Sequence, residues 1–359
     1  MSKNPSREFP FITALETVRS LMTLMDRFAL GIVLVIDDNR RLEATITDGD
    51  VRRAILKGVE LDQSVSELLA MRKDNSSQVG PIVAPLGTSP DELRLLMAEY
   101  HVRQIPILDQ EQRVVDLAMD FDILGPSTLP LDGFIMAGGF GKRLTPLTEK
   151  CPKPMLKVSG TPIIERLIGK LRAAGIQHVS IATHYLAEHI VDHFHDGRDF
   201  GVHIEYVEED RPMGTAGALA RASRREFPML VINGDILTSI DFRAMLEFHR
   251  ENSPQMTVAV RQYDVRIPFG VITTNGVEAI SIVEKPLIRN FVNAGIYLIQ
   301  PGVCKMVPQD RAYDMPDLIT ALLDAKKRVA CFPIHEYWLD VGQPEHYERA
   351  SADVARGLV

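Results

Sequence analysis

The stretch GGFGKRLTPLTEKCPKPMLK, from Gly138 to Lys157, says most about how this chain folds. It follows the apolar run FIMA at 134–137, which predicts a buried strand, and precedes PIIE at 162–165, which predicts the start of a helix. A glycine-rich turn after a strand lets the backbone approach a phosphate closely, because no Cβ is in the way. The stretch holds five Lys or Arg residues against one Glu, a net charge of +4, in a chain whose net charge is −8. Such a loop, leaving the first strand of an α/β domain, predicts a nucleoside triphosphate site.

This loop matches neither of the two common phosphate-binding fingerprints, G-x-x-x-x-G-K-[ST] and G-x-G-x-x-G. Prolines at 146, 152 and 154 lie close in sequence to Arg143 and Lys153, and proline restricts the backbone. A restricted backbone around two cations favours a binding role over the alternative, an ordinary turn with surface lysines.

With these residues, the stretch resembles the signature of the sugar-1-phosphate nucleotidyltransferases, also called nucleotide-sugar pyrophosphorylases. The resemblance spans residues 133–359. It implies that Gly138 and Gly139 bind the nucleotide. It also implies that Arg143 stabilises the departing pyrophosphate and that Lys153 contacts the α-phosphate.

The bulk composition is that of an ordinary globular protein, with 359 residues, 45% hydrophobic and 25% charged. The pI near 5.7 argues against a nucleic-acid-binding protein. Three scattered cysteines without a C-x-x-C motif favour a reducing cytoplasm and no structural zinc. We expect a cytoplasmic protein that is not bound to a membrane, because the N-terminus has no apolar signal segment and no apolar run could cross a bilayer.

Two domains are expected from the length and from the segment GPSTLP at 125–130, which has the composition of a linker. We predict an N-terminal domain at 1–125, a linker at 126–132 and a catalytic domain at 133–359. The N-terminal part contains a repeat: Val35-Ile36-Asp37 matches Ile107-Leu108-Asp109, 72 residues later. The predicted repeats cover about 13–70 and 82–125.

This repeat resembles a tandem CBS-domain (Bateman-type) module of the α+β class, with YHVRQIPI at 100–107 especially similar to a second CBS repeat. The resemblance implies an adenine nucleotide bound through a T/S-x-x-D element, which the first repeat has as Thr47 and Asp50. In the second repeat Met119 replaces the Thr. A purely structural or dimer-forming module remains the alternative. Pairing of such modules implies a homo-oligomer.

Downstream of the linker, predicted strands alternate with predicted helices. HVSIAT at 178–183 and MLVING at 229–234 are examples of the strands, and DFRAMLEFHR at 241–250 is one of the helices. Such alternation favours an α/β, Rossmann-like fold with a mostly parallel sheet.

Two carboxylates are candidates for a metal site. Asp235 comes directly after the apolar run of MLVING, which places it at the carboxyl edge of the sheet, where α/β proteins bind ligands. Asp340 lies in YWLDVG at 337–342. Hard cations take oxygen ligands, and the resemblance implies that Asp235 and Asp340 jointly hold Mg²⁺.

A sugar-binding set follows from the resemblance. In EKP at 284–286 it implies that Lys285 grips the phosphate of a sugar 1-phosphate and that Glu284 binds sugar hydroxyls. In FVNAGIY at 291–297 it implies that Asn293 and Gly295 line the sugar pocket.

The base pocket is predicted in EDRPMGTAG at 209–217, where Gly214 opens a helix and Glu209, Gly214 and Thr215 bind the nucleotide. Glu209 stands where thymidylyltransferases of this family typically carry Gln. A carboxylate accepts two hydrogen bonds and donates none. Guanine presents N1–H and N2–H₂ side by side, whereas uracil and thymine present one N–H between two carbonyls. Glu209 therefore favours GTP, and uridylyl, thymidylyl or cytidylyl transfer remains the alternative.

Together these residues predict an enzyme that converts a nucleoside triphosphate and a sugar 1-phosphate to a nucleotide sugar and pyrophosphate. The chain resembles bacterial guanylyltransferases that act on glucosamine 1-phosphate or mannose 1-phosphate for surface glycans. A different class remains open, a non-catalytic nucleotide sensor built on the CBS pair.

Overall fold

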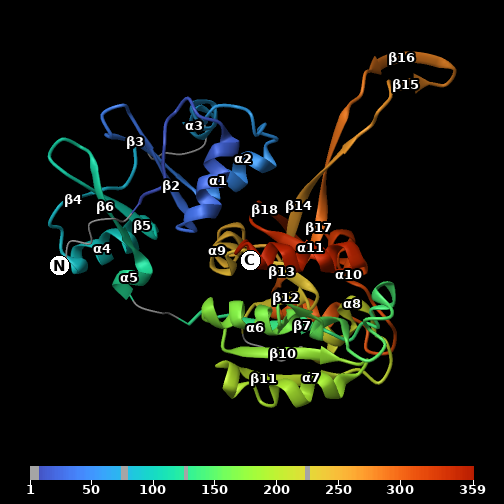
Figure 1. Ribbon diagram of the computed structural model, residues 1–359. Coiled ribbons are helices and arrows are strands. Elements are labelled where there is room, and N and C mark those ends of the chain that lie inside the picture. Colours follow the sequence, from blue (N-terminus) through green and yellow to red (C-terminus); the bar gives the residue numbers. More distant parts are fainter. Residues whose placement is uncertain (1–7, 74–79, 125–127, 223–226) are drawn as a thin grey trace. The chain divides into compact units, whose positions relative to one another are not determined.

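A computed structural model describes residues 8–73, 80–124, 128–222 and 227–359 (Figure 1). The chain splits into two compact units, Met1–Ser127 and Thr128–Val359. Residues 126 and 127 of the predicted linker lie outside the described residues. No helix among the described residues is long and apolar enough to span a membrane. The three cysteines are free thiols.

The first unit contains two sets of elements with the same order. The first set is β1 (Phe11–Ile12), α1 (Val18–Phe28), β2 (Ile32–Ile36), β3 (Leu42–Thr47) and α2 (Asp48–Leu56), followed by α3 (Val65–Lys73). The second set is β4 (Ala84–Pro85), α4 (Pro90–Tyr100), β5 (Gln104–Leu108), β6 (Val114–Met119) and α5 (Asp120–Leu124). Each set forms one three-stranded sheet, with the strand orders β1-β2-β3 and β4-β5-β6. The register shift between Val35 and Ile36 recurs between Ile107 and Leu108.

The two sets pack against each other through their sheets. Ile32 and Leu34 of β2 form one buried cluster with Leu117 and Met119 of β6. The Gln104 side chain also donates a hydrogen bond to the Leu30 carbonyl at 3.0 Å. The apolar side chains of each repeat are therefore buried against the other repeat as well as against the helices of their own repeat.

The second unit is built on one large sheet. Its elements up to the middle of the sheet are β7 (Asp132–Met136), β8 (Lys157–Val158), β9 (Thr161–Pro162), α6 (Ile163–Ala173), β10 (His178–Thr183), α7 (Ala187–Phe194), β11 (His203–Glu208), α8 (Gly214–Gly217) and β12 (Met229–Asn233). The remaining elements are β13 (Ile236–Thr238), α9 (Phe242–Asn252), β14 (Met256–Arg266), β15 (Val271–Asn275), β16 (Glu278–Val283), β17 (Leu287–Ile299), α10 (Met315–Asp324), β18 (Val329–Ile334), β19 (Trp338–Asp340) and α11 (Pro344–Ala355).

The sheet has seven strands in the order β11-β10-β7-β12-β17-β14-β18. Its neighbours are parallel, except that β17 runs antiparallel to both β12 and β14. The predicted α/β fold with a mostly parallel sheet is confirmed.

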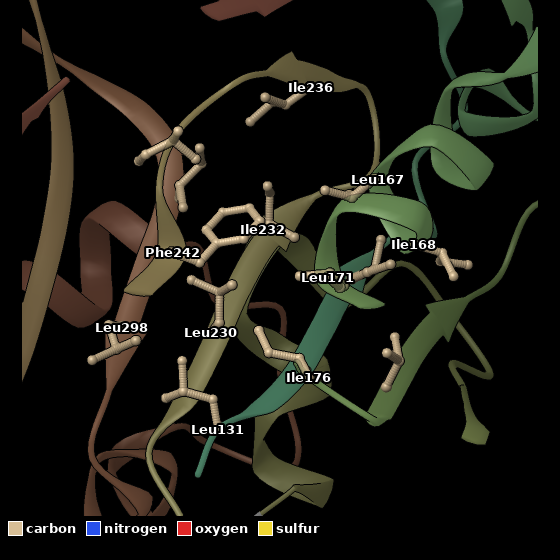
Figure 2. Close-up of a cluster of buried hydrophobic side chains, with 14 of the residues drawn as sticks. Leu131, Leu167, Ile168, Leu171, Ile176, Leu230, Ile232, Ile236, Phe242 and Leu298 are labelled. Carbon is tan, nitrogen blue, oxygen red and sulfur yellow. The ribbon is translucent and has the colours of Figure 1, made fainter. Parts of the chain in front are cut away.

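Helices cover both faces, because strand residues alternate between them. Ile135 faces the cluster that contains α6, α7 and α9, and its neighbour Phe134 faces the cluster that contains α10. Figure 2 shows Leu167 and Leu171 of α6 close to Leu230 and Ile232 of β12.

Two segments differ from simple expectations. The helix predicted to open at Gly214 is a single α-turn, α8, followed by a 3₁₀ segment at Ala218–Arg221. Beyond the sheet, β14 and β17 continue as a two-stranded ribbon that ends in the β15–β16 hairpin (Figure 1). We call residues 261–292 the arm.

Candidate active site

A cavity of about 420 Å³ lies at the carboxyl ends of β7 and β12. Nine residues predicted from the sequence line it: Gly138, Gly139, Arg143, Lys153, Glu209, Gly214, Thr215, Asp235 and Asp340. Lys142 and Asn233, which were not among the predicted site residues, line it too. The carboxyl edge of a parallel sheet is where α/β proteins bind ligands, so the position agrees with the fold.

The loop after β7 is held by its own polar contacts. The Thr148 hydroxyl donates to the Gly141 carbonyl at 3.0 Å. The Tyr185 hydroxyl lies 3.3 Å from the Thr148 carbonyl and 3.1 Å from the Glu149 carbonyl. Leu144, which follows Arg143 in the sequence, is buried in a hydrophobic cluster with Leu156 and Val341. The loop therefore has a fixed course, and its residues Lys142, Arg143 and Lys153 stand at defined places on the cavity wall.

Asp235 and Asp340 meet because two short strands pair. β13 and β19 run antiparallel, with Ile236 opposite Asp340. The Val341 amide donates to the Asp235 carbonyl at 3.1 Å. This pairing joins two carboxylates that are 105 positions apart in the sequence (340 minus 235).

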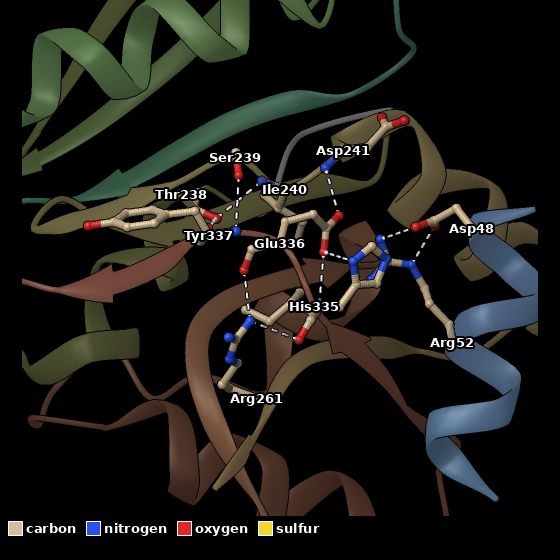
Figure 3. Close-up of polar contacts among 11 residues, drawn as sticks. Asp48, Arg52, Thr238, Ser239, Ile240, Asp241, Arg261, His335, Glu336 and Tyr337 are labelled. Atoms are coloured by element: carbon tan, nitrogen blue, oxygen red, sulfur yellow. Dashed lines mark hydrogen bonds and ion pairs between the residues drawn. The ribbon is translucent and has the colours of Figure 1, made fainter. Parts of the chain in front are cut away.

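The segment before Asp340 is anchored by a polar network (Figure 3). The Thr238 hydroxyl donates to the Tyr337 carbonyl at 2.9 Å, and the Tyr337 amide donates to the Ser239 hydroxyl at 3.1 Å. The Arg261 guanidinium donates to the Glu336 carbonyl at 2.7 Å. With its preceding residues fixed on both sides, Asp340 has little freedom to leave the cavity.

Lys153 stands between the two carboxylates. Its ammonium forms an ion pair with Asp235 Oδ2 and lies 3.8 Å from Asp340 Oδ1. Burial and then the negative charge of Asp235 raise the pKa of Asp340, while Lys153 and Arg143 lower it. The two Oδ1 atoms are buried and have no hydrogen-bond partner among the described residues. Two buried carboxylate oxygens that lack a partner fit a hard divalent cation.

Glu209 lines the same cavity. Its carboxylate approaches Gly138 so closely that a Cβ there would stand 2.7 Å from Glu209 Oε2, which explains the glycine. The ring of His184 donates from Nδ1 to the Glu209 carbonyl at 2.8 Å and fixes the backbone. Burial raises the pKa of the Glu209 carboxyl, and the His184 ring and a Met213 backbone hydrogen bond partly offset this. Glu209 is therefore a half-buried acceptor aimed into the cavity.

Asp314 is a residue of the candidate site that was not predicted from the sequence. Its Oδ1 accepts hydrogen bonds from the Thr215 amide at 2.7 Å and the Thr215 hydroxyl at 3.1 Å. Gly214 has a φ of +78°, and a Cβ there would lie 2.7 Å from Asp314 Oδ1 and from the Tyr313 carbonyl. The helix-capping pattern at Asp314, with Asp317 three residues later, was the available signal, but it does not reveal this long-range contact.

A second cavity of about 370 Å³ adjoins the first and shares Thr215, Asn233 and Asp340 with it. Asn293 and Gly295 line it as predicted, and Asn293 Oδ1 accepts from the Gly295 amide at 2.9 Å. Its other lining residues are Ile236, Ala294, Tyr297, Asp314, Pro316 and Trp338. Among the described residues that line it there is no Lys or Arg, and Asp314 and Asp340 make it acidic.

Glu284 and Lys285 are not brought to either cavity. Both are exposed and lie on the arm, between β16 and β17. Lys285 has a left-handed backbone, with a φ of +46°, and its amide donates to the Phe269 carbonyl at 3.2 Å. Glu284 Oε2 lies against Gly270.

Thr47 and Asp50 form a capping box at the start of α2. Asp50 Oδ2 accepts from both the amide and the hydroxyl of Thr47 at 2.9 Å, and its Oδ1 accepts from Arg53 at 2.8 Å. The structure thus shows a helix-capping role for this pair, and a nucleotide-binding role stays a prediction.

Comparison with protein families gives two matches. The model of the family described as Nucleotidyl transferase matches residues 132–357, and the model of the CBS domain matches residues 3–57.

Curated relatives match the same part of the chain. A mannose-1-phosphate guanylyltransferase from Mycobacterium tuberculosis is 36% identical over 242 residues, which are 65% of this chain and 67% of the relative. A mannose-1-phosphate guanyltransferase from Yarrowia lipolytica is 31% identical over 226 residues, which are 60% of this chain and 62% of the relative. The chain thus spans about two thirds of the length of the first and less of the second.

Among solved structures, HddC from Yersinia pseudotuberculosis complexed with GMP-PN is similar to this chain. The TM-score is 0.50 with 26% sequence identity, and the match covers 62% of this chain and 99% of that chain.

Proposed function

The chain belongs to the nucleotidyl transferase family, and from that premise we propose that it transfers guanylyl from GTP to a sugar 1-phosphate and releases pyrophosphate. The observation that carries the proposal is the meeting of Arg143, Lys153, Asp235 and Asp340 with Glu209 in one cavity. Cations and carboxylates from separate elements line one cavity with a half-buried acceptor, which is what a triphosphate with a guanine base requires.

The reaction needs no protein nucleophile. A phosphate oxygen of the sugar 1-phosphate attacks the α-phosphorus of GTP in line, the bond from the α-phosphorus to the bridging oxygen breaks, and pyrophosphate leaves with that oxygen. Both reactants are anions, so the protein has to align them and neutralise their charge. In this proposal Lys153 contacts the α-phosphate and Arg143 stabilises the pyrophosphate, while Gly138 and Gly139 let the backbone approach the nucleotide.

Mg²⁺ is the cofactor in this proposal, held by Asp235 and Asp340, whose buried Oδ1 atoms lack a partner among the described residues. When bound, it would neutralise charge on the phosphates of both substrates. The Lys153 ammonium pairs with Asp235 and offsets part of the negative charge of the two carboxylates.

GTP is the proposed donor because Glu209 offers two acceptor oxygens and no donor. The relatives named as guanylyltransferases and the neighbour complexed with GMP-PN support this choice. Gly214 and Thr215 would lie along the base, because they line the same cavity as Glu209.

The second cavity is the proposed sugar site, with Asn293 and Gly295 on its wall. Mannose 1-phosphate, the substrate in the names of the relatives, and glucosamine 1-phosphate are the first sugars to test. An adenine nucleotide at Thr47 and Asp50, a homo-oligomer and a cytoplasmic location belong to the same proposal.

The test is pyrophosphate release by the full-length protein with Mg²⁺, each nucleoside triphosphate and a panel of hexose and hexosamine 1-phosphates. We expect release with GTP and one sugar 1-phosphate, and its loss when EDTA is added. Release with UTP, dTTP or CTP alone would keep the enzyme class and overturn the assignment of guanine to Glu209. No release with any pair, also with adenine nucleotides added, would favour the nucleotide sensor.

A further inference from the structure

The arm is the most apolar exposed part of the described chain. Eleven large apolar side chains in it are each at least 42% exposed: Tyr263, Val265, Phe269, Ile272, Val277, Ile280, Ile282, Val283, Leu287, Ile288 and Phe291. Contiguous exposed apolar surface of this kind marks an interaction site.

A ribbon of two strands cannot bury its own side chains. Val265 lies opposite Ile288 on one face of the ribbon, and strand alternation puts Tyr263 on that same face. In the hairpin, Val271 pairs with Val283. An isolated two-stranded hairpin is marginal in water and needs a further layer to pack on. The exposed apolar side chains of the arm therefore require a further surface that packs on them.

The arm also carries a cation that the second cavity lacks. A sugar 1-phosphate is an anion, yet the described lining of that cavity contains Asp314 and Asp340 and no Lys or Arg. Lys285 is exposed on the arm, beside Glu284. Its left-handed backbone, costly for a lysine, is kept in place by the bond from its amide to Phe269.

Lys285 cannot reach the second cavity of its own chain. β17 runs unbroken from Leu287 to Ile299, and Asn293 on the cavity wall is six residues from Leu287. At about 3.4 Å per residue, the strand carries Lys285 roughly 20 Å or more away from Asn293. The root of the arm is fixed as well, because the Arg261 guanidinium donates to the carbonyls of Ile334 and Glu336.

We propose that the arm docks on a second copy of this chain and delivers Lys285 and Glu284 to the second cavity of that copy. A two-fold pair of identical chains meets both needs together, because each arm is covered by the partner and each acidic cavity receives a cation. The inference rests on the proposed function for the role of Lys285, and on the exposed apolar surface for the docking.

The test of delivery is complementation between two inactive variants of the full-length chain. Lys285→Met removes the cation of the arm, Asp235→Asn disables the first cavity, and each homo-oligomer is expected to lose about 10²-fold or more of its turnover. The two variants are co-expressed with different tags and purified as a mixed dimer. That dimer has one intact site, formed by the Lys285→Met cavity and the arm of the Asp235→Asn chain. We expect about half of the wild-type turnover per dimer.

A matched control replaces Lys285→Met by Lys327→Met, an exposed lysine outside both cavities and the arm. Lys327→Met alone should keep full turnover. A mixed dimer of Lys285→Met with Asp235→Asn that stays as inactive as its parents would overturn delivery to the partner. Full turnover of the Lys285→Met homo-oligomer would overturn it too.

Hydrogen exchange of residues 271–283 tests the docking without any activity. We expect slow exchange in the dimer, because the arm is covered by a second copy, and fast exchange in the monomer obtained by dilution below the dissociation constant. Fast exchange in the dimer, or equal protection in dimer and monomer, would overturn the docking. A wild-type protein that is inactive with all substrates would refute the proposed function and with it the delivery of Lys285, and exchange would still decide the docking.

Discussion

Glu209→Gln is the change that most directly tests how the base is chosen. Gln keeps the size of the side chain but replaces one acceptor oxygen by an NH₂ donor. One of the two hydrogen bonds that Glu209 is proposed to accept from guanine is then lost, and a donor faces a donor. A hydrogen bond to a charged group contributes about 1.5–3 kcal/mol. Since 1.36 kcal/mol corresponds to a factor of ten in rate, kcat/KM for GTP should fall about 10–150-fold.

The structure supports the upper part of this range. The Glu209 carboxylate is half buried and packed over Gly138, and its backbone is held by Thr183 and His184. The side chain therefore cannot swing into bulk water to relieve the mismatch. Burial also raises the pKa of Glu209, so kcat/KM for GTP should fall on acidification at a higher pH than an exposed Glu would give.

The assay compares GTP with ITP, whose base lacks the 2-amino group. The wild-type protein should prefer GTP about 10-fold or more, because ITP leaves one carboxylate oxygen without its donor. Glu209→Gln should remove most of that preference. Glu208→Gln, at the exposed neighbouring position, is the control and should behave as wild type. An unchanged ratio of GTP to ITP in Glu209→Gln would refute the assignment.

Three further predictions concern catalysis and stability. Lys153→Ala should lower kcat about 10²–10³-fold with the fold intact by circular dichroism, because a cation is lost from the proposed phosphate site; near-normal turnover would remove Lys153 from the proposed mechanism. Gly214→Ala should lower the free energy of unfolding in urea by about 1–3 kcal/mol, since its backbone is left-handed and a Cβ would meet Asp314. Gly302→Ala, where a Cβ meets nothing within 4 Å, is the control, and equal stability of the two variants would contradict the reasoning. Burial lowers the pKa of His249 from 6.5 to about 4, so the folded protein keeps the ring neutral while the unfolded chain takes up a proton. The stabilisation is complete above pH 6.5 and is lost as the pH falls towards 4, with about 2 kcal/mol lost at pH 5. In His249→Asn the free energy of unfolding, measured in urea, should therefore depend less on pH between 7 and 5. The same pH dependence as in the wild type would refute this.

Much of the fold could be predicted because local pattern determines it. The apolar runs around Phe134, Val179 and Val231 predicted strands that the structure contains as β7, β10 and β12. Their alternation with helices predicted a parallel sheet. This alternation gives no information on the direction of β17, which runs antiparallel to its neighbours. The short α8 also differs from expectation, because Gly214 and Gly217 favour a helix only weakly.

The candidate site was predicted more unevenly. Residues on the loop after β7 and at the end of β12 follow directly from sequence, since a strand end fixes where its next residues stand. Asp314 was missed because its partner Thr215 is 99 residues away. Lys285 was assigned to the sugar site from the resemblance, whereas the structure puts it on an arm that leaves that site.

The sequence by itself determined the basic glycine- and proline-rich loop, the strands beside it, and the acceptor chemistry of Glu209, because these depend on residue type and short spacing. Only the tertiary structure decided that β13 pairs with β19 and brings Asp235 to Asp340, that Glu209 packs over Gly138, and that the arm carries Lys285 away from its own cavity. The physical reason is that long-range contacts come from the packing of whole elements, and no local periodicity records which elements will meet.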